Sequence, residues 1–310
     1  MPTRREFLAG AVALVAAACT GGSKKVTPSE SPSSIGSLLQ GADQQLSLIQ
    51  AQSSLDVGKS RFTFGLSTAS GGLLQGGAPE VFLARDQSSQ PMGPFHSAFY
   101  QLTAYEKTGD RSPRTPITGY YTTVLKVPSA GTWAVAAVAK APSGEGVGVA
   151  ALKAETNPPN GIGDHAISVR TPVATTEHGI REICTRTPPD PMHYVSLADA
   201  LTSGKPTVVV FATPALCESR FCGPIVDENL LVFRSVGRQR ANFIHVEEFL
   251  PGKDLKPPPA FAKNRSPAFK AWHLVTEPWT FVIDRAGIIR ARFEGPVAAP
   301  QIEQALRPLL

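Results

Sequence analysis

Residues 207–224 read TVVVFATPALCESRFCGP, and this stretch decides the class of fold. Residues 207–211 form an uninterrupted run of apolar and β-branched side chains. Such a run is typical of a strand that is buried on both faces of an α/β sheet. Cys217 and Cys222 follow closely, and apolar residues then recur at helical spacing over residues 225–236. The stretch therefore predicts a strand, a cysteine-bearing segment and a helix.

The chain beyond this stretch continues to alternate between strand and helix signals. Residues 241–246 and 279–284 are mainly apolar and predict two further core strands. In residues 288–293, apolar and polar side chains alternate, so this stretch is predicted to pair with residues 279–284 as a hairpin. Residues 300–309 predict a closing helix. We therefore predict an α/β domain over residues 190–310.

This order of elements resembles the thioredoxin fold, over about two-fifths of the chain. The strand that ends in Phe211-Ala212-Thr213, the cysteines at the start of a helix, and Pro278 just before a strand carry the resemblance. Pro278 occupies the place of that family's cis-proline. The overall pattern is most similar to exported thioredoxin-like and peroxiredoxin-like domains of bacterial envelopes. The resemblance implies that Cys217 is the nucleophile, that Cys222 is the resolving thiol and that Pro278 lies against the pair.

The position of the cysteines suggests their chemistry. A cysteine at a helix N-terminus meets unpaired backbone N–H groups and the positive end of the helix dipole, which favour the thiolate. A thiolate can attack a disulfide, and a second thiol then resolves the mixed disulfide. Glu277, beside Pro278, can tune the thiolate or accept its proton, and the alternative is a solvated surface carboxylate.

The spacing of Cys217 and Cys222 departs from the thioredoxin pattern of two intervening residues, because four residues separate them. On a regular helix their Cα atoms would lie roughly 8–9 Å apart, beyond disulfide reach. Either Cys217 lies in a loop before the helix or the two never pair. Cys217 can otherwise act alone, like a peroxidatic cysteine, or the pair can bind Cu(I) together with His245 or His273.

Cys184 is a third thiol, just before the predicted α/β domain. The chain has four cysteines, and if Cys19 carries lipid after export, three thiols remain. An odd number of thiols in an oxidising compartment leaves one free or allows exchange among them. We weigh two roles for Cys184: a buried structural thiol, or a resolving thiol carried to the site by the preceding segment. Met192-His193 could approach a metal, but a simple edge position is the favoured interpretation. We assign no cofactor and no metal ligand.

The first 58 residues predict export and anchoring. Arg4-Arg5 precede a short apolar stretch, residues 8–18, which ends in small residues before Cys19. This arrangement resembles a twin-arginine signal joined to a lipoprotein cleavage box, over residues 1–19, and the resemblance implies lipidation of Cys19. Residues 20–58 predict a flexible tether, within which residues 38–55 form either a short helix docked on the next domain or part of the stalk.

Residues 59–156 show short alternating runs between turn signals, which predict an antiparallel β-sandwich of immunoglobulin-like type. Residues 157–189 predict a linker that wraps onto the second domain. The expected fold is therefore multi-domain, with a β-sandwich followed by a thioredoxin-like α/β domain.

Composition narrows the class of function. The net charge of the 310 residues is only +5, and we find no basic run interleaved with aromatic residues, so we expect no nucleic-acid partner. No apolar run reaches the roughly 18 residues that a membrane-spanning helix needs. We expect a lipid-anchored thiol-disulfide oxidoreductase on the extracytoplasmic face of the cell membrane, with thiol or disulfide proteins of the envelope as partners. The alternatives are a non-catalytic binding or scaffold lipoprotein with this fold and a Cu(I)-binding envelope protein.

Overall fold

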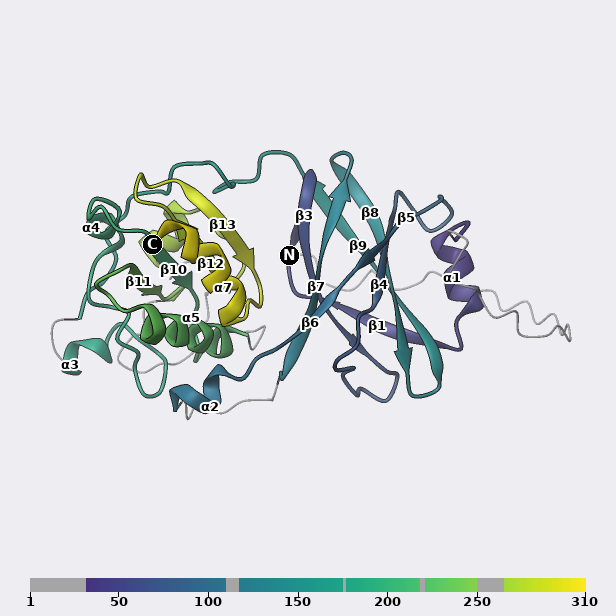
Figure 1. The fold of residues 1–310 in the computed structure, drawn as a ribbon, viewed down its shortest axis with the longest axis horizontal. Helices are drawn as coiled ribbons and strands as arrows, with labels where there is room; N and C mark the ends of the chain where they lie inside the picture. Colours follow the sequence, from purple (N-terminus) through teal and green to yellow (C-terminus); the bar gives the residue numbers. More distant parts are fainter. Residues whose placement is uncertain (1–31, 110–116, 175–176, 218–220, 250–264) are drawn as a thin grey trace, which may run out of the picture.

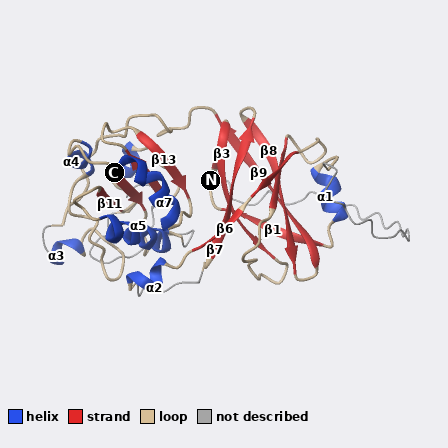
Figure 2. Cartoon of the chain, viewed as in Figure 1, coloured by secondary structure: helices blue, strands red, loops and turns tan. Residues whose placement is uncertain are grey.

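The computed structural model describes residues 32–109, 117–174, 177–217, 221–249 and 265–310. Cys19 and the predicted export signal lie outside these residues. Two bodies lie side by side: a β-rich body built from the earlier part of the chain and an α/β body built from the later part (Figures 1 and 2). In the described part of the chain, no helix combines the length and the apolar character that crossing a membrane requires.

The described part of the first body contains nine strands and one short helix, and a second short helix that leaves its sheet packs against the second body (Figure 1). The strands are β1 (Gln44–Gln50), β2 (Ser54–Asp56), β3 (Gly58–Ser67), β4 (Glu80–Ala84), β5 (Met92–His96), β6 (Ala98–Gln101), β7 (Gly119–Val127), β8 (Gly131–Ala141) and β9 (Gly144–Glu155); the helices are α1 (Ile35–Gly41) and α2 (Ala104–Thr108). The strands form one sheet in the order β5-β4-β8-β9-β1-β3-β7-β6, and β2 also pairs with β9.

This sheet differs from the predicted antiparallel sandwich of immunoglobulin-like type, which is not confirmed. β1 and β2 run parallel to β9, whereas β1 is antiparallel to β3, so the sheet is mixed and β1 joins its two halves. The sheet curls like a barrel until its far strands meet, where Thr123 of β7 donates a hydrogen bond to the carbonyl oxygen of His96 at the end of β5 (2.8 Å). The core between the halves is apolar and includes Phe62, Phe64 and Trp133.

The N-terminal boundary of this body lies earlier than the sequence predicts. Residues 35–56, which we assigned to the tether, form α1, β1 and β2. Ser34 caps α1 through a reciprocal pair of hydrogen bonds with Ser37, and Ile35 is fully buried. The prediction failed because apolar and polar residues alternate only weakly along β1. Its parallel partner strand also lies about a hundred residues away, as in the Gln44–Gly146 pairing.

The second body is an α/β unit with a four-stranded sheet in the order β11-β10-β12-β13. Its strands are β10 (Thr207–Phe211), β11 (Asn242–Val246), β12 (Trp279–Ile283) and β13 (Ile289–Glu294); its helices are α3 (Glu177–Ile180), α4 (Leu197–Leu201), α5 (Cys222–Val236), α6 (Pro267–Ala271), α7 (Ala299–Leu306) and the short 3-10 turn η2 (Arg307–Leu309). β11 is parallel to β10, and β12 and β13 continue antiparallel. With α5 after β10 and α7 at the end, this is the thioredoxin-like fold that the sequence predicts.

Every residue of β10 is buried, and its two faces contribute to separate cores. Val208 and Val210 pack in the core that contains α5 and α7 residues. Val209 and Phe211 pack on the opposite face with Trp272 and other aromatic residues. Helices and loops therefore cover both faces of the sheet. This explains why polar and apolar side chains do not alternate along residues 207–211, as they would in a strand with one exposed face.

The segment between the bodies follows the second one closely. Gly163 and Ala166 donate backbone hydrogen bonds to the carbonyl oxygens of Ile289 and Gly287, both 2.8–2.9 Å long. His165 forms an isolated bridge with Ile288 and is itself exposed. This part of residues 157–189 thus lies along the β12–β13 hairpin.

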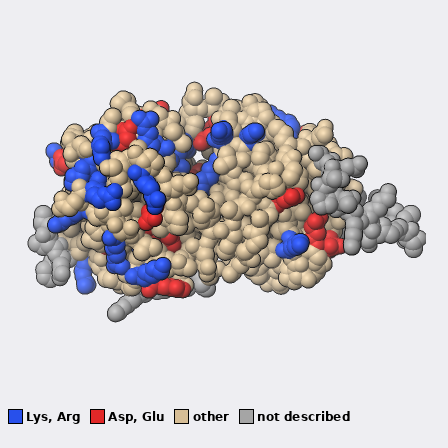
Figure 3. Space-filling view, in the orientation of Figure 1, with Lys and Arg blue, Asp and Glu red and all other residues tan. Residues whose placement is uncertain are grey.

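The two bodies share buried surface. Leu102 and Tyr120, from the first body, belong to the same apolar core as α5 and α7. Arg61 of β3 donates hydrogen bonds to the carbonyl oxygens of Glu294 and Pro296. Gly295 fits tightly here, since a Cβ atom at this position would lie 1.9 Å from the carbonyl oxygen of Ala51. The outer surface differs between the bodies: in the view of Figure 3, basic side chains gather over the second body with acidic ones among them.

Candidate active site

Cys217 and Cys222 form a disulfide bond at the point where the chain leaves the sheet. Cys217 lies in the loop after β10, and Cys222 is the first residue of α5. Their Cα atoms are 6.0 Å apart, within the usual range for a disulfide. The loop position of Cys217 makes the bridge possible, so the first of the two alternatives that the spacing left open is confirmed.

The two sulfurs have different surroundings. Cys222 is fully buried in the core beneath α5, whereas Cys217 is half-buried at the edge of that core. Because α5 begins at Cys222, the positive end of the helix dipole acts on Cys222 rather than on Cys217, where the sequence argument placed it, and full burial of Cys222 opposes that effect. An incoming thiol can therefore reach Cys217, and Cys222 is suited to leave as a thiolate.

Glu277 brings a carboxyl group to the disulfide. The Glu277–Pro278 peptide bond is cis, as the resemblance implied for Pro278. A carboxylate oxygen of Glu277 lies within 4.8 Å of both sulfurs. Burial, reinforced by the negative charge of Glu248, holds the pKa of Glu277 well above its usual range. The carboxyl group therefore keeps its proton where an ordinary glutamate has lost it, and the alternative of a solvated surface carboxylate is wrong.

Thr213 ties the cysteine loop to the neighbouring carboxylates. Its hydroxyl oxygen accepts hydrogen bonds from the backbone N–H groups of Glu248 (2.8 Å) and Phe249 (3.3 Å), and it also bonds to Glu277, which moderates the rise in that pKa. Glu248 forms an ion pair with Arg265 at 2.7 Å. Thr213 is completely buried, so the loop that carries Cys217 is fixed at its base.

Sequence reasoning missed Thr213 and Glu248. Each is the second residue after a parallel strand, β10 or β11, and residues that follow neighbouring parallel strands meet at the same edge of a sheet. Applied to the predicted strands, that rule would have placed these two residues beside the cysteine loop.

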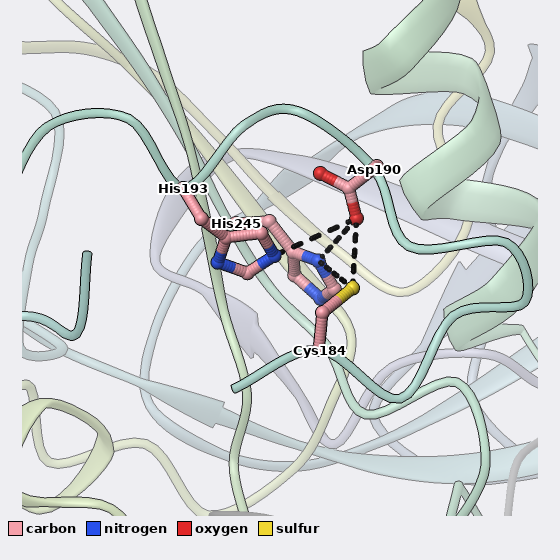
Figure 4. Close-up of side chains that lie close together, drawn as sticks. All are labelled: Cys184, Asp190, His193 and His245. Carbon is pink, nitrogen blue, oxygen red and sulfur yellow. Dashed lines mark hydrogen bonds and ion pairs between the residues drawn. The ribbon is translucent and has the colours of Figure 1, made fainter. Parts of the chain in front are cut away.

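Cys184 lies in a separate buried cluster with Asp190, His193 and His245 (Figure 4). Its thiol donates a hydrogen bond to Asp190 Oδ2 at 3.3 Å, and burial, with a smaller contribution from the charge of Asp190, raises its pKa to about 11. These surroundings fit the structural thiol of the sequence analysis better than the resolving thiol, because resolution needs a thiolate.

The histidines do not complete a copper site at the disulfide. Both ring nitrogens of His245 have partners away from it, Asp190 Oδ2 and the carbonyl oxygen of Ala212. His273 is exposed. Met192 and His193 are buried, so the edge position favoured for them is wrong.

Known structures resemble the chain at low sequence identity. No protein-family model matches the chain, and no curated protein matches it. Among solved structures, a thioredoxin-like superfamily protein is 14% identical, covering 48% of this chain and 96% of its own, with a TM-score of 0.32. A thiol-disulfide isomerase from Corynebacterium glutamicum is 19% identical, covering 38% and 89%, with a TM-score of 0.30. A thiol:disulfide interchange protein of the thioredoxin family from Chlorobium tepidum is also 19% identical, covering 46% and 99%, with a TM-score of 0.28. The thioredoxin-like assignment rests on the strand order, the helix positions and the site itself.

Proposed function

We propose that the chain is a thiol-disulfide oxidoreductase of thioredoxin-like type, anchored to the membrane and facing away from the cytoplasm. One observation carries the proposal: a disulfide joins a half-buried sulfur to a fully buried one at a helix N-terminus, with the Glu277 carboxyl group within 4.8 Å of both. A disulfide that served stability alone would have no need of a half-buried cysteine or of a nearby carboxyl group whose pKa is raised.

The geometry suggests the order of bond changes. A substrate thiolate attacks Cys217 Sγ and forms a mixed disulfide, while the Cys217–Cys222 bond breaks and its electron pair passes to Cys222 Sγ. Cys222 is stabilised as a thiolate by the N-terminal N–H groups of α5 or takes a proton from Glu277. A second substrate thiolate then attacks the substrate sulfur and releases Cys217. The substrate dithiol is oxidised, the protein is reduced, and the reverse sequence reduces a substrate disulfide.

Equilibration with thiol buffers tests this function. The purified protein should interconvert between the bridged and dithiol forms in glutathione buffers, as followed by alkylation and mass spectrometry, and it should accelerate exchange in a model disulfide peptide. The Cys217→Ser/Cys222→Ser variant should lack the acceleration. A bridge that stays closed in millimolar thiol would instead support a non-catalytic binding module.

The anchor and the compartment are supported by the N-terminal sequence. Arg4-Arg5, the apolar stretch at residues 8–18 and Cys19 resemble a twin-arginine lipoprotein signal. Labelling of producing cells with radioactive palmitate should mark the wild-type protein and leave a Cys19→Ala variant unlabelled in the soluble fraction. Equal labelling of both would overturn the anchor without touching the thiol chemistry.

Replacing Glu277 by glutamine should slow reduction of the disulfide by at least about tenfold, because the amide cannot transfer a proton to the leaving sulfur. The sign of the pH dependence follows from the raised pKa of Glu277. The ratio of the wild-type rate to the Glu277→Gln rate should be largest while the carboxyl group is protonated. It should fall to one as the pH rises through the raised pKa. The rate difference is measured by stopped-flow reduction with dithiothreitol at several pH values around neutrality. The rates are corrected for the fraction of dithiothreitol present as thiolate.

Glu248→Gln is the matched control, because Glu248 raises the pKa of Glu277 without belonging to the group of ligand atoms around the sulfurs. This variant should keep the full rate at low pH and lose it at a lower pH than wild type. A constant ratio of wild-type to Glu277→Gln rates at every pH would show that Glu277 does not act as an acid.

A further inference from the structure

The four side chains of the Cys184 cluster come from two places in the chain. Cys184, Asp190 and His193 belong to the segment that precedes β10, and His245 belongs to β11 (Figure 4). All four residues are at most 5% exposed. They bring one thiol, one carboxylate and two imidazoles together, and the four ligand atoms lie within 4.8 Å of one another.

The separations between these atoms fit the edges of a coordination tetrahedron. Asp190 Oδ2 lies 3.3 Å from Cys184 Sγ, 2.8 Å from His245 Nδ1 and 3.7 Å from His193 Nε2. Cys184 Sγ and His245 Nδ1 are 3.9 Å apart. Metal–ligand bonds of about 2.0–2.3 Å at tetrahedral angles would set these edges at roughly 3.3–3.7 Å. The four measured edges lie within about 0.5 Å of these values, and the two edges from His193 to Cys184 and to His245 are at most 4.8 Å, so a small metal ion fits once the His193 side chain moves inward.

Two further features point to a ligand at the centre. His245 Nε2 lies 2.9 Å from the carbonyl oxygen of Ala212 and donates its N–H there, while Nδ1 faces Asp190 Oδ2 at 2.8 Å, where a metal ion would replace the shared proton. Ligating histidines commonly have this arrangement, in which a backbone carbonyl fixes the tautomer. His193 is only 3% exposed, yet its Nε2 atom has no hydrogen-bond partner and faces Asp190 at 3.7 Å. A buried nitrogen of this kind is costly unless something binds it.

We propose that Cys184, Asp190, His193 and His245 bind a zinc ion. Zinc accepts sulfur, nitrogen and oxygen ligands together in four-coordinate sites, whereas Mg²⁺ and Ca²⁺ prefer oxygen alone and Cu(I) prefers soft ligands without a carboxylate. Binding releases the proton of the Cys184 thiol and the proton that His245 Nδ1 donates to Asp190. A thiolate, a carboxylate and Zn²⁺ then sum to zero charge, which a buried site requires.

The role of this zinc is structural, because all four positions are filled by the protein and none is left for a substrate. It fastens the segment of residues 184–193 to β11, next to the strand that leads into the cysteine loop. Cys184 also lines an open pocket of about 500 Å³ together with Arg186 and Pro188, which offers the ion a route from solvent. The disulfide does not share any of these ligands, so zinc binding and thiol exchange can be tested separately.

Metal content and cobalt spectroscopy test the site in the full chain. After dialysis against a chelator, the protein should take up one equivalent of zinc, measured by competition with a chromophoric chelator and by elemental analysis. Co²⁺ in its place should give thiolate-to-cobalt charge transfer and the visible bands of a tetrahedral site. His193→Ala and Cys184→Ser should each weaken uptake by at least about tenfold, and Cys184→Ser should also abolish the charge-transfer band.

Controls separate this site from the other thiols. Cys217→Ser/Cys222→Ser and the exposed His165→Ala should keep full uptake and the cobalt spectrum. Uptake lost in the double cysteine variant, or tight uptake of Cu(I) alone, would overturn the proposal. The wild-type titration needs no variant to fold, so a wild-type chain that takes up no zinc would overturn it as well.

Discussion

Replacing Cys222 by serine should turn the protein into a trap that accumulates mixed disulfides at Cys217. Cys217 is the half-buried sulfur and Cys222 is fully buried, so an incoming disulfide meets the Cys217 thiol first. Without Cys222, no second thiol can resolve the product, because the Cys184 thiol is buried with a pKa raised to about 11. Incubation with an aromatic disulfide, followed by intact-mass analysis, should show one stable adduct per chain and a loss of turnover of at least about a hundredfold.

Cys217→Ser is the matched partner of this experiment. It should form no adduct under the same conditions, because its remaining site sulfur, Cys222, lies in the core beneath α5. The opposite pattern, with adducts in Cys217→Ser and none in Cys222→Ser, would reverse the roles given to the two sulfurs.

Replacing Arg186 by methionine should reduce the free energy of unfolding by about 3–5 kcal/mol. Arg186 is 2% exposed and its guanidinium group lies 2.8 Å from Asp227 Oδ1, whose side chain is fully buried. Arg186 also donates a hydrogen bond to the carbonyl oxygen of Thr108 (3.3 Å). The methionine would leave the Asp227 carboxylate without its cation in the interior. Chemical denaturation followed by tryptophan fluorescence measures the loss.

Two comparisons isolate the ion pair. The double variant Arg186→Met/Asp227→Leu should recover a large part of the lost stability, because no charge then stays buried alone. Arg170→Met breaks an ion pair whose side chains are 82% and 56% exposed, and it should change stability little. Equal losses in the single and double variants would mean that packing, and not the charge on Asp227, sets the cost.

The α/β body could be predicted from local sequence because its signals are strong and close together. β10, β11 and β12 are each fully buried over five residues, so each appears as a short run in which apolar and β-branched side chains predominate. Pro278 was recognisable because it directly precedes β12, and Cys217 because it is the first cysteine after β10, in the loop that leads to the helix. The predicted roles of the two cysteines as nucleophile and resolving thiol stay predictions, although the bridge between them is present.

The remaining features depend on contacts between distant segments. β1 pairs with β9 across about a hundred residues, and nothing in the short sequence of β1 specifies that partner. Cys184 meets His245 across 61 residues, through a segment whose path the sequence does not define. The start of α5 at Cys222 was missed because apolar spacing becomes regular only at Ile225, three residues later.

Leu102 and Tyr120 of the β-rich body lie within the core of α5 and α7, so the two bodies need to be expressed together. A gene fragment that encodes only the α/β body would expose the apolar surface that Leu102 and Tyr120 cover, and we expect its product to aggregate. Because this core is shared, the packing that orients the α/β body against the β-rich body also sets the position of the Cys217–Cys222 disulfide relative to it.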